Sequence, residues 1–165
     1  MILCRVGALP LILVVAAAGL NPWLTLLITA GLATFTRYAP LAPPFDTLVN
    51  GYGRPLLAVL ALVLGIEVVV GKIPRFARLA ERVDLSAAGL AGALLGAALP
   101  SALRAAGWPW AAAGGAVIAM AVRFGRRRAV VVLNQRLWRF GYIGVGIAAN
   151  VLAGIATAAA FAMSR

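Results

Sequence analysis

The sequence contains no histidine and a single cysteine, Cys4. Without histidine, the chain cannot form a Ser-His-Asp triad, a Cys-His pair or a zinc site with histidine ligands. One cysteine also excludes a disulfide within the chain. Only four residues are acidic, so few side chains remain for general acid–base catalysis. We therefore expect a protein that is not an enzyme and that binds no metal and no cofactor.

Charged residues are scarce as well: they make up 12% of the 165 residues, whereas 64% are hydrophobic and the mean hydropathy is +1.01. Soluble domains are closer to half apolar and a quarter charged. A soluble fold of this size could not bury so much apolar surface, and several apolar runs approach the ~20 residues that span a bilayer as a helix. The composition predicts one transmembrane domain over residues 1–165.

The charges that are present are mostly basic, with 15 lysines and arginines and a net charge of +11. In a membrane protein, such an excess marks cytoplasmic loops and contacts with anionic headgroups, and we expect no nucleic-acid partner. Anionic membrane lipids are the expected partners. The candidate headgroup ligands are Arg75, Arg78, Arg82, Arg126, Arg127 and Arg128.

The first apolar run, Val6 to Thr36, has no charged residue but is interrupted by Asn21-Pro22. Proline lacks an N–H group and clashes with the carbonyl four residues earlier, so a helix must kink or break there. Two shapes fit this pattern. We favour one interrupted span, and the alternative is a hairpin of two half-helices, Val6–Leu20 and Trp23–Thr36.

The rest of the chain predicts an all-α, polytopic membrane protein with about five spans in total. Arg37–Tyr52 is rich in proline and glycine and is expected to be a loop. Ile73–Val83 has apolar residues on one helical face and basic residues on the others, which predicts a cytoplasmic amphipathic helix in the membrane interface. The other predicted spans are Pro55–Gly71, Leu85 to about Arg104, Trp110–Phe124 and Gly141–Ser164, with a tight turn at Trp108-Pro109-Trp110.

Two segments are rich in basic residues, 72–82 and the expected loop 123–139. Two predicted spans separate them, so they fall on the same side of the membrane, and the positive-inside rule makes that side cytoplasmic. A single first span would then place the N-terminus inside, whereas a hairpin would place it outside.

A few polar residues lie within the apolar runs. Glu67 is a lone carboxylate in the second predicted span, where a charge costs about 2.5–3.5 kcal/mol at mid-helix. It is part of an ion pair with Lys72, Arg75 or a later basic residue, or a carboxylic acid kept neutral by desolvation, or a cation or proton site in a transport path. The helix break frees backbone groups, which transporters use to bind solutes. The candidate transport or ion-site residues are Glu67, Asn21, Pro22, Thr25, Lys72 and Asn150, and we expect Asn150 to hydrogen-bond to another helix.

Glycines recur at helical spacing in two predicted spans. Such small residues allow helices in a membrane to approach closely. The candidate packing residues are Gly89, Gly92 and Gly96 in the third span, and Gly146 and Gly154 in the last.

Two segments, Gly19–Leu27 (GLNPWLTLL) and Glu67–Pro74 (EVVVGKIP), resemble an uncharacterised bacterial membrane family, domain of unknown function 4126. The resemblance extends over roughly Gly19 to Leu99 and implies a multi-pass protein of the bacterial cytoplasmic (inner) membrane, with no established activity. This chain departs from the family pattern, which places an Asp where Gly71 stands and Gly-Val-Asp where Arg75-Phe76-Ala77 stands. Two acidic groups are therefore missing beside Glu67.

Two functions fit these observations. The first is a small transporter or channel-like protein for a small solute, ion or proton, which forms a homo-oligomer because five short spans enclose little space. The alternative is a structural or accessory subunit of a larger membrane complex, which packs through its glycine-rich helices and binds anionic lipid.

Overall fold

The computed structural model describes residues 8–36, 45–70, 77–98, 108–137 and 140–163. These ranges are helical except at Asn21, which confirms the predicted all-α fold for the described residues. The helices are α1 (Ala8–Leu20), α2 (Pro22–Thr36), α3 (Phe45–Val70), α4 (Ala77–Ala98), α5 (Trp108–Leu137) and α6 (Phe140–Met163).

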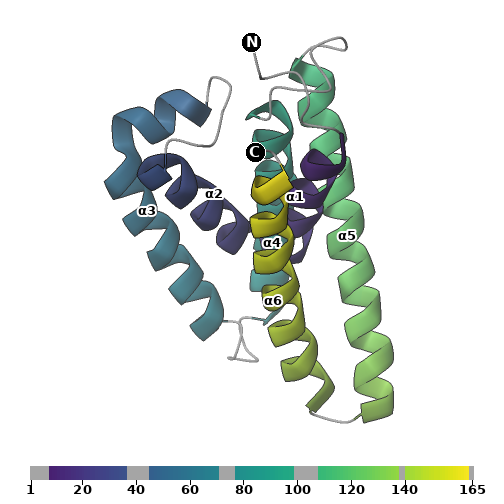
Figure 1. The fold of residues 1–165 in the computed structure, drawn as a ribbon. Helices are drawn as coiled ribbons and strands as arrows, with labels where there is room; N and C mark the ends of the chain where they lie inside the picture. The colour runs from purple at the N-terminus through teal and green to yellow at the C-terminus, as the bar shows by residue number, and fades with distance from the viewer. Residues whose placement is uncertain (1–7, 37–44, 71–76, 99–107, 138–139, 164–165) are drawn as a thin grey trace.

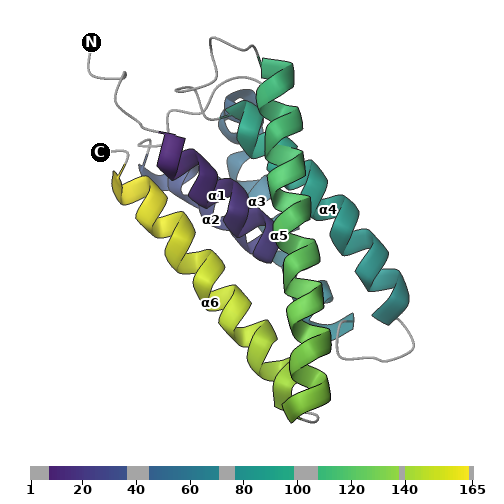
Figure 2. The ribbon, with the colours of Figure 1, turned by 90° about the vertical axis from the view of Figure 1, so that its right-hand side faces the viewer.

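The chain reverses direction at the predicted break. α1 runs from one end of the molecule to a point partway along it, and α2 turns back toward the end from which α1 came (Figures 1 and 2). The interruption at Asn21-Pro22 is thus confirmed, but the favoured single kinked span is replaced by the hairpin of half-helices. Pro22 begins α2, where its missing N–H costs nothing, and Asn21 lies outside both helices.

The other four helices run along the length of the molecule in alternating directions (Figures 1 and 2). The C-terminal ends of α3 and α5 therefore lie at the same end as the N-terminal ends of α4 and α6. We call this the basic end, because it includes the described parts of segments 72–82 and 123–139. The tip of the α1–α2 hairpin points toward the basic end.

Several predicted boundaries are corrected by the structure. Residues 45–52, expected to be loop, form the first turns of α3, and the non-helical dihedrals of Tyr52 (φ −130°, ψ 24°) relieve the clash that Pro55 brings. The separate interfacial helix does not exist in the described residues, since residues 77–83 continue directly into α4. Likewise, the predicted turn at 108–110 is the start of α5, and the predicted basic loop is helical as far as Leu137.

Two helices are long and apolar enough to cross a membrane, through Thr47–Val69 in α3 and Gly146–Met163 in α6. This is fewer than the five predicted spans, although Pro22–Phe35 is a shorter apolar helix. The first predicted span is divided into the shorter helices α1 and α2, and α4 and α5 continue into charged sequence. Arg78, Glu81, Arg82 and Asp84 are in the first turns of α4, and Arg123, Arg126, Arg127 and Arg128 are in the second half of α5.

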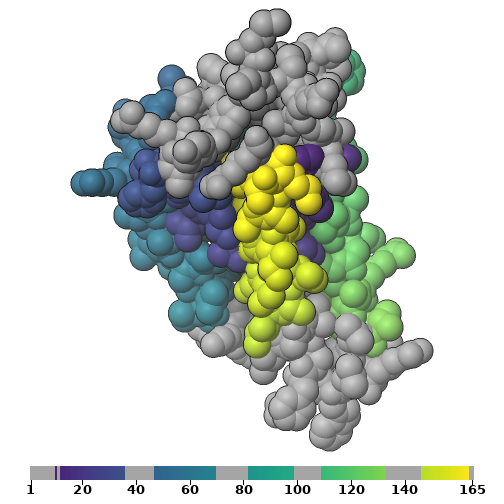
Figure 3. All heavy atoms as spheres, viewed as in Figure 1, coloured from purple at the N-terminus to yellow at the C-terminus, as the bar shows by residue number. Residues whose placement is uncertain are grey.

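Alanines make up more than half of the buried hydrophobic residues, and many large apolar side chains lie on the outside. Alanines such as Ala18, Ala30 and Ala88 are fully buried. By contrast, Leu62 on α3 and Val117 on α5 are more than half exposed, and α3, α5 and α6 make up much of the face in Figure 3. A water-soluble fold would place these large groups inside, so this arrangement suits an apolar solvent.

The closest helix crossing joins α4 and α5. A Cβ atom added to Gly92 would lie 2.5 Å from the carbonyl oxygen of Gly115, and one added to Gly96 would collide with the carbonyl of Ala111. Gly89 matters less for this close approach, because its added Cβ would lie 3.4 Å from Met120 Sδ, an atom of a flexible side chain. The predicted packing role of Gly146 and Gly154 is not seen, because an added Cβ at either meets no described atom within 4 Å.

Candidate functional site

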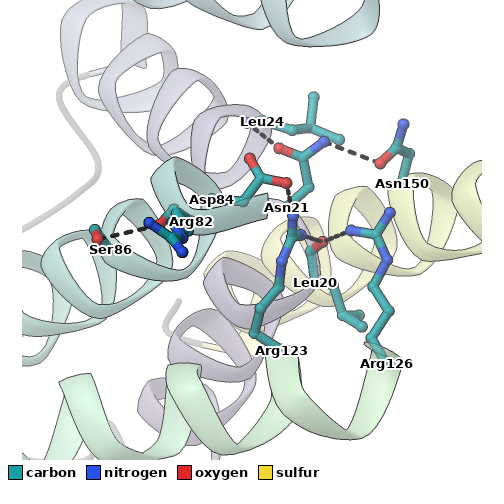
Figure 4. A network of polar contacts seen from close by, with 9 residues as sticks. All are labelled: Leu20, Asn21, Leu24, Arg82, Asp84, Ser86, Arg123, Arg126 and Asn150. Carbon is teal, nitrogen blue, oxygen red and sulfur yellow. Dashed lines mark hydrogen bonds and ion pairs between the residues drawn. The ribbon is translucent and has the colours of Figure 1, made fainter. Parts of the chain in front are cut away.

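Polar groups from α1, α3, α4, α5 and α6, and from the connection between α1 and α2, lie around the hairpin tip, and Figure 4 shows those other than Glu67. We call this set the polar cluster. It consists of the Leu20 carbonyl and the side chains of Asn21, Glu67, Asp84, Arg123, Arg126 and Asn150.

Two arginines of α5 bind the end of α1. The last carbonyls of a helix have no partner within the helix and carry partial negative charge, which attracts cations. Arg123 Nη1 donates to the Leu20 carbonyl oxygen at 3.0 Å, and Arg126 Nη1 donates to the same oxygen. The hairpin tip is thereby held against α5.

Arg123 also forms an ion pair with Asp84 of α4. The two side chains are only 13% and 17% exposed. A charge that is removed from water needs a close partner of opposite sign and further hydrogen bonds. Arg123 has both, since its guanidinium contacts a carboxylate and a backbone carbonyl, and it connects α1, α4 and α5.

Asn21 shapes the hairpin tip through both atoms of its amide. Its Oδ1 accepts from the Leu24 N–H at 3.0 Å, which caps the start of α2. Its Nδ2 donates to Asn150 Oδ1 of α6 at 2.9 Å. Asn21 is 3% exposed, so an unpaired amide here would be costly. Asn150 thus makes the bond to another helix that the sequence predicts.

Glu67 brings α3 to the cluster. Its carboxylate interacts electrostatically with Asp84, Arg123 and Arg126. Its Oε2 atom is buried, and among the described residues no group donates a hydrogen bond to it. The two acids and the two arginines cancel in charge when all are ionised. Uptake of a proton or a cation by Glu67 would change this charge balance. Binding of a positive charge is therefore the main chemistry that the cluster can perform.

Two threonines in the first half of α2, Thr25 and Thr29, are also buried. Thr25 is fully buried, and its hydroxyl donates to the Asn21 carbonyl at 2.9 Å. It therefore stabilises the first turn of α2. Thr29, one turn further along, has a buried hydroxyl for which no described group serves as a partner.

The structure brings together three of the predicted site residues, Asn21, Glu67 and Asn150, and places Pro22 and Thr25 next to them. Arg126, predicted to bind lipid headgroups, is partly buried and donates a hydrogen bond to the Leu20 carbonyl. Arg82, Arg127 and Arg128 are exposed, as headgroup contacts would require. Lys72, Arg75 and the side chain of Arg78 lie outside the described part of the chain.

Two cluster residues, Asp84 and Arg123, were not among the sequence candidates. Arg123 is the first residue of the basic segment 123–139, which was expected to be a loop, and Asp84 falls between the predicted amphipathic helix and the third predicted span. One signal was available: Asp84 and Arg123 each stand at the boundary between a charged and an apolar stretch. A charge in that position often faces the protein interior. The described residues include no group of three or more Cys, Asp or Glu side chains that could hold a metal ion.

A family model, Domain of unknown function (DUF4126), matches residues 10–164. The chain belongs to the DUF4126 family. The match extends well beyond the Gly19–Leu99 region that carries the resemblance in the sequence. No curated protein and no solved structure matches the chain. In this DUF4126 member, Asp84 of α4 supplies an acidic group that interacts with Glu67, although the chain has Gly71 where the family pattern places an aspartate.

We expect Asn21→Ala to be more damaging than Asn150→Ala. The first substitution removes the cap of α2 and the contact with α6, whereas the second removes the contact alone. Loss of an N-cap typically costs about 1 kcal/mol, and an interhelical hydrogen bond in a membrane protein contributes about 0.6 kcal/mol on average. The free energies of unfolding in mixed micelles, measured for both variants and the double variant, test this order. Equal losses for the two single variants would contradict it.

Proposed function

We propose that this DUF4126 protein is a multi-pass protein of the bacterial cytoplasmic membrane that moves a small ion, a proton or a small solute across it. The basic end, in this proposal, faces the cytoplasm. The hairpin begins at the end of the molecule opposite the basic end, and α6 ends there too (Figure 1). The start of α1 and the end of α6 therefore face the outside. Two helices are long and apolar enough to span a membrane, and the large apolar side chains on the exterior support lipid as the solvent.

The observation that carries the proposal is the polar cluster at the hairpin tip. Half-helices that meet within a bundle expose backbone groups, which membranes tolerate only when protein covers them or when they line a cavity. Here the Leu20 carbonyl accepts hydrogen bonds from two arginines, and the Leu24 N–H donates to Asn21. Asp84 and Asn150 in turn bind Arg123 and Asn21, and Glu67 interacts electrostatically with both arginines. A protein that only fills space in a membrane has no need for this many polar groups away from its ends, since each costs free energy to insert.

Glu67 is the residue we propose to carry the transported charge. It is the member of the cluster with a buried carboxylate oxygen that no described group satisfies, whereas Asp84 is paired with Arg123. Protonation of Glu67 would leave the two arginines opposite a single acid. The resulting positive charge would alter the hydrogen bonds of the arginines to the Leu20 carbonyl, so ion uptake at Glu67 would be linked to the packing of the hairpin tip.

The test is the flux of protons and small cations in proteoliposomes. We expect Glu67→Gln to reduce flux to the level of protein-free liposomes while helix content and elution volume remain unchanged. Val68→Gln is the matched control, because it adds the same amide at the next position of α3, where the side chain is about half exposed. It should retain flux. Flux that is equal in the wild type and Glu67→Gln would contradict the role of Glu67.

A second function, an accessory subunit of a larger membrane complex, is favoured by the position of α3. Only 6% of its most apolar 18-residue stretch is buried within this chain, so a partner helix has room to pack there. Absence of flux from the wild type, together with purification in a fixed ratio with another membrane protein, would favour this function over transport.

A further inference from the structure

A groove between α2 and α4 lies outside the polar cluster. It is open, with a volume of about 330 Å³, and is lined by Trp23, Arg82, Val83, Ser86, Ala87 and Leu90. The five α4 residues are spaced alternately one and three positions apart, so they share one helical face. Asp84 lies on a different face of α4, where it pairs with Arg123.

The walls of the groove are mostly hydrocarbon. Val83 is 53% exposed and Leu90 is 67% exposed, so apolar surface is left open here. The Ser86 hydroxyl donates a hydrogen bond to the Arg82 carbonyl at 3.1 Å, so its donor already has a partner. The exposed guanidinium of Arg82 is the charged group of the lining.

The charge lies at one end of the groove. α4 begins at the basic end (Figure 1), so Arg82 is nearer to that end than Leu90, by roughly 12 Å along the helix axis at 1.5 Å per residue. A ligand that matches this surface has an anionic group next to Arg82 and a hydrocarbon chain that extends toward Leu90. A small soluble anion would leave the apolar walls uncovered, and a neutral hydrocarbon would leave the cation without a partner.

We propose that this groove binds one anionic phospholipid, with its phosphate on Arg82 and one acyl chain along Val83, Ala87 and Leu90 against Trp23. The proposal rests on the membrane location given above but not on transport. A basic side chain near a membrane surface favours an anionic over a zwitterionic lipid by about fivefold. The net charge of +11 raises the local concentration of such lipids further.

Trp23 provides a direct probe, because bromine atoms on an acyl chain quench the fluorescence of a tryptophan in contact with it. Trp108→Phe, Trp110→Phe and Trp138→Phe leave Trp23 as the sole tryptophan. This variant is reconstituted in phosphatidylcholine vesicles that contain either brominated phosphatidylglycerol or brominated phosphatidylcholine, each over the same range of mole fractions. We expect brominated phosphatidylglycerol to quench at an about fivefold lower mole fraction, and Arg82→Gln to remove this preference.

Arg128→Gln is the matched control, because Arg128 is exposed on α5 and absent from the groove lining. It should retain the preference. Equal quenching by the two lipids, no quenching by either, or a preference that survives Arg82→Gln would overturn the proposal. Native mass spectrometry of the chain with all its tryptophans gives a second readout, in which Arg82→Gln should retain fewer phosphatidylglycerol molecules than Arg128→Gln.

The outcome also separates this proposal from the others. A chain released from membranes by a carbonate wash would overturn the membrane location and the lipid site together. Loss of lipid preference in Arg82→Gln with normal flux would support the lipid site as a separate feature of the protein. Retained preference in Arg82→Gln would overturn the lipid site and leave the transport proposal standing.

Discussion

Arg123→Gln is expected to lower the free energy of unfolding by about 3 kcal/mol, the low end of the range for breaking a buried ion pair. The substitution leaves Asp84 without its cationic partner at a position where the carboxylate side chain is 17% exposed. It also removes one of the two donors to the Leu20 carbonyl. Unfolding by SDS titration in mixed micelles measures the loss.

Arg128→Gln is the control for this prediction, because it removes the same charge from the same helix. The Arg128 guanidinium lies 5.1 Å from the centre of the Phe124 ring, an exposed contact that contributes about 0.5–1 kcal/mol. Asp84→Asn in the Arg123→Gln background should cost less than it costs alone, because the two residues act as a pair. A loss in Arg123→Gln no larger than that in Arg128→Gln would show that the ion pair does not hold the hairpin.

Gly115→Ala should also be strongly destabilising, by about 1–3 kcal/mol, as expected for overpacking. An added Cβ would collide with the Gly92 carbonyl oxygen. That atom belongs to the backbone of α4, so it cannot rotate away as a side chain could, and the two helices must separate. The same micelle titration measures this effect.

Gly114→Ala provides a control one position away on α5. An added Cβ at Gly114 meets no described atom within 4 Å, and alanine favours helix over glycine by about 1 kcal/mol. We therefore expect Gly114→Ala to be neutral or slightly stabilising. Equal destabilisation by the two substitutions would mean that α4 and α5 do not cross as closely as the structure places them.

The sequence was most informative where a property depends on residues close together in the chain. Proline 22 marked the break between α1 and α2, and the apolar run of 141–164 predicted α6 to within one residue at each end. It was misleading where a charged stretch was interpreted as a loop. Residues 123–137 are helical because arginine is a good helix former, and charge alone does not end a helix.

The candidate site was only partly predictable for a similar reason. Glu67, Asn21 and Asn150 stood out because each is a polar residue within an apolar run. Asp84 and Arg123 did not, because their significance depends on each other, across 39 positions of the chain. Arg126 reaches the Leu20 carbonyl across 106 positions, and such a contact exists only once the hairpin is packed against α5.

Residues close together in the chain are enough to specify the helical, apolar character of this protein and the place where its first helix breaks, because hydrophobicity, proline geometry and helix propensity act locally. Packing between distant segments is needed to specify that α2 turns back, that two acids lie near two arginines, and which glycines touch another helix. These features depend on how the helices are arranged in space. The same residues in a straight first span would leave the Leu20 carbonyl bonded within its own helix and the arginines without this acceptor.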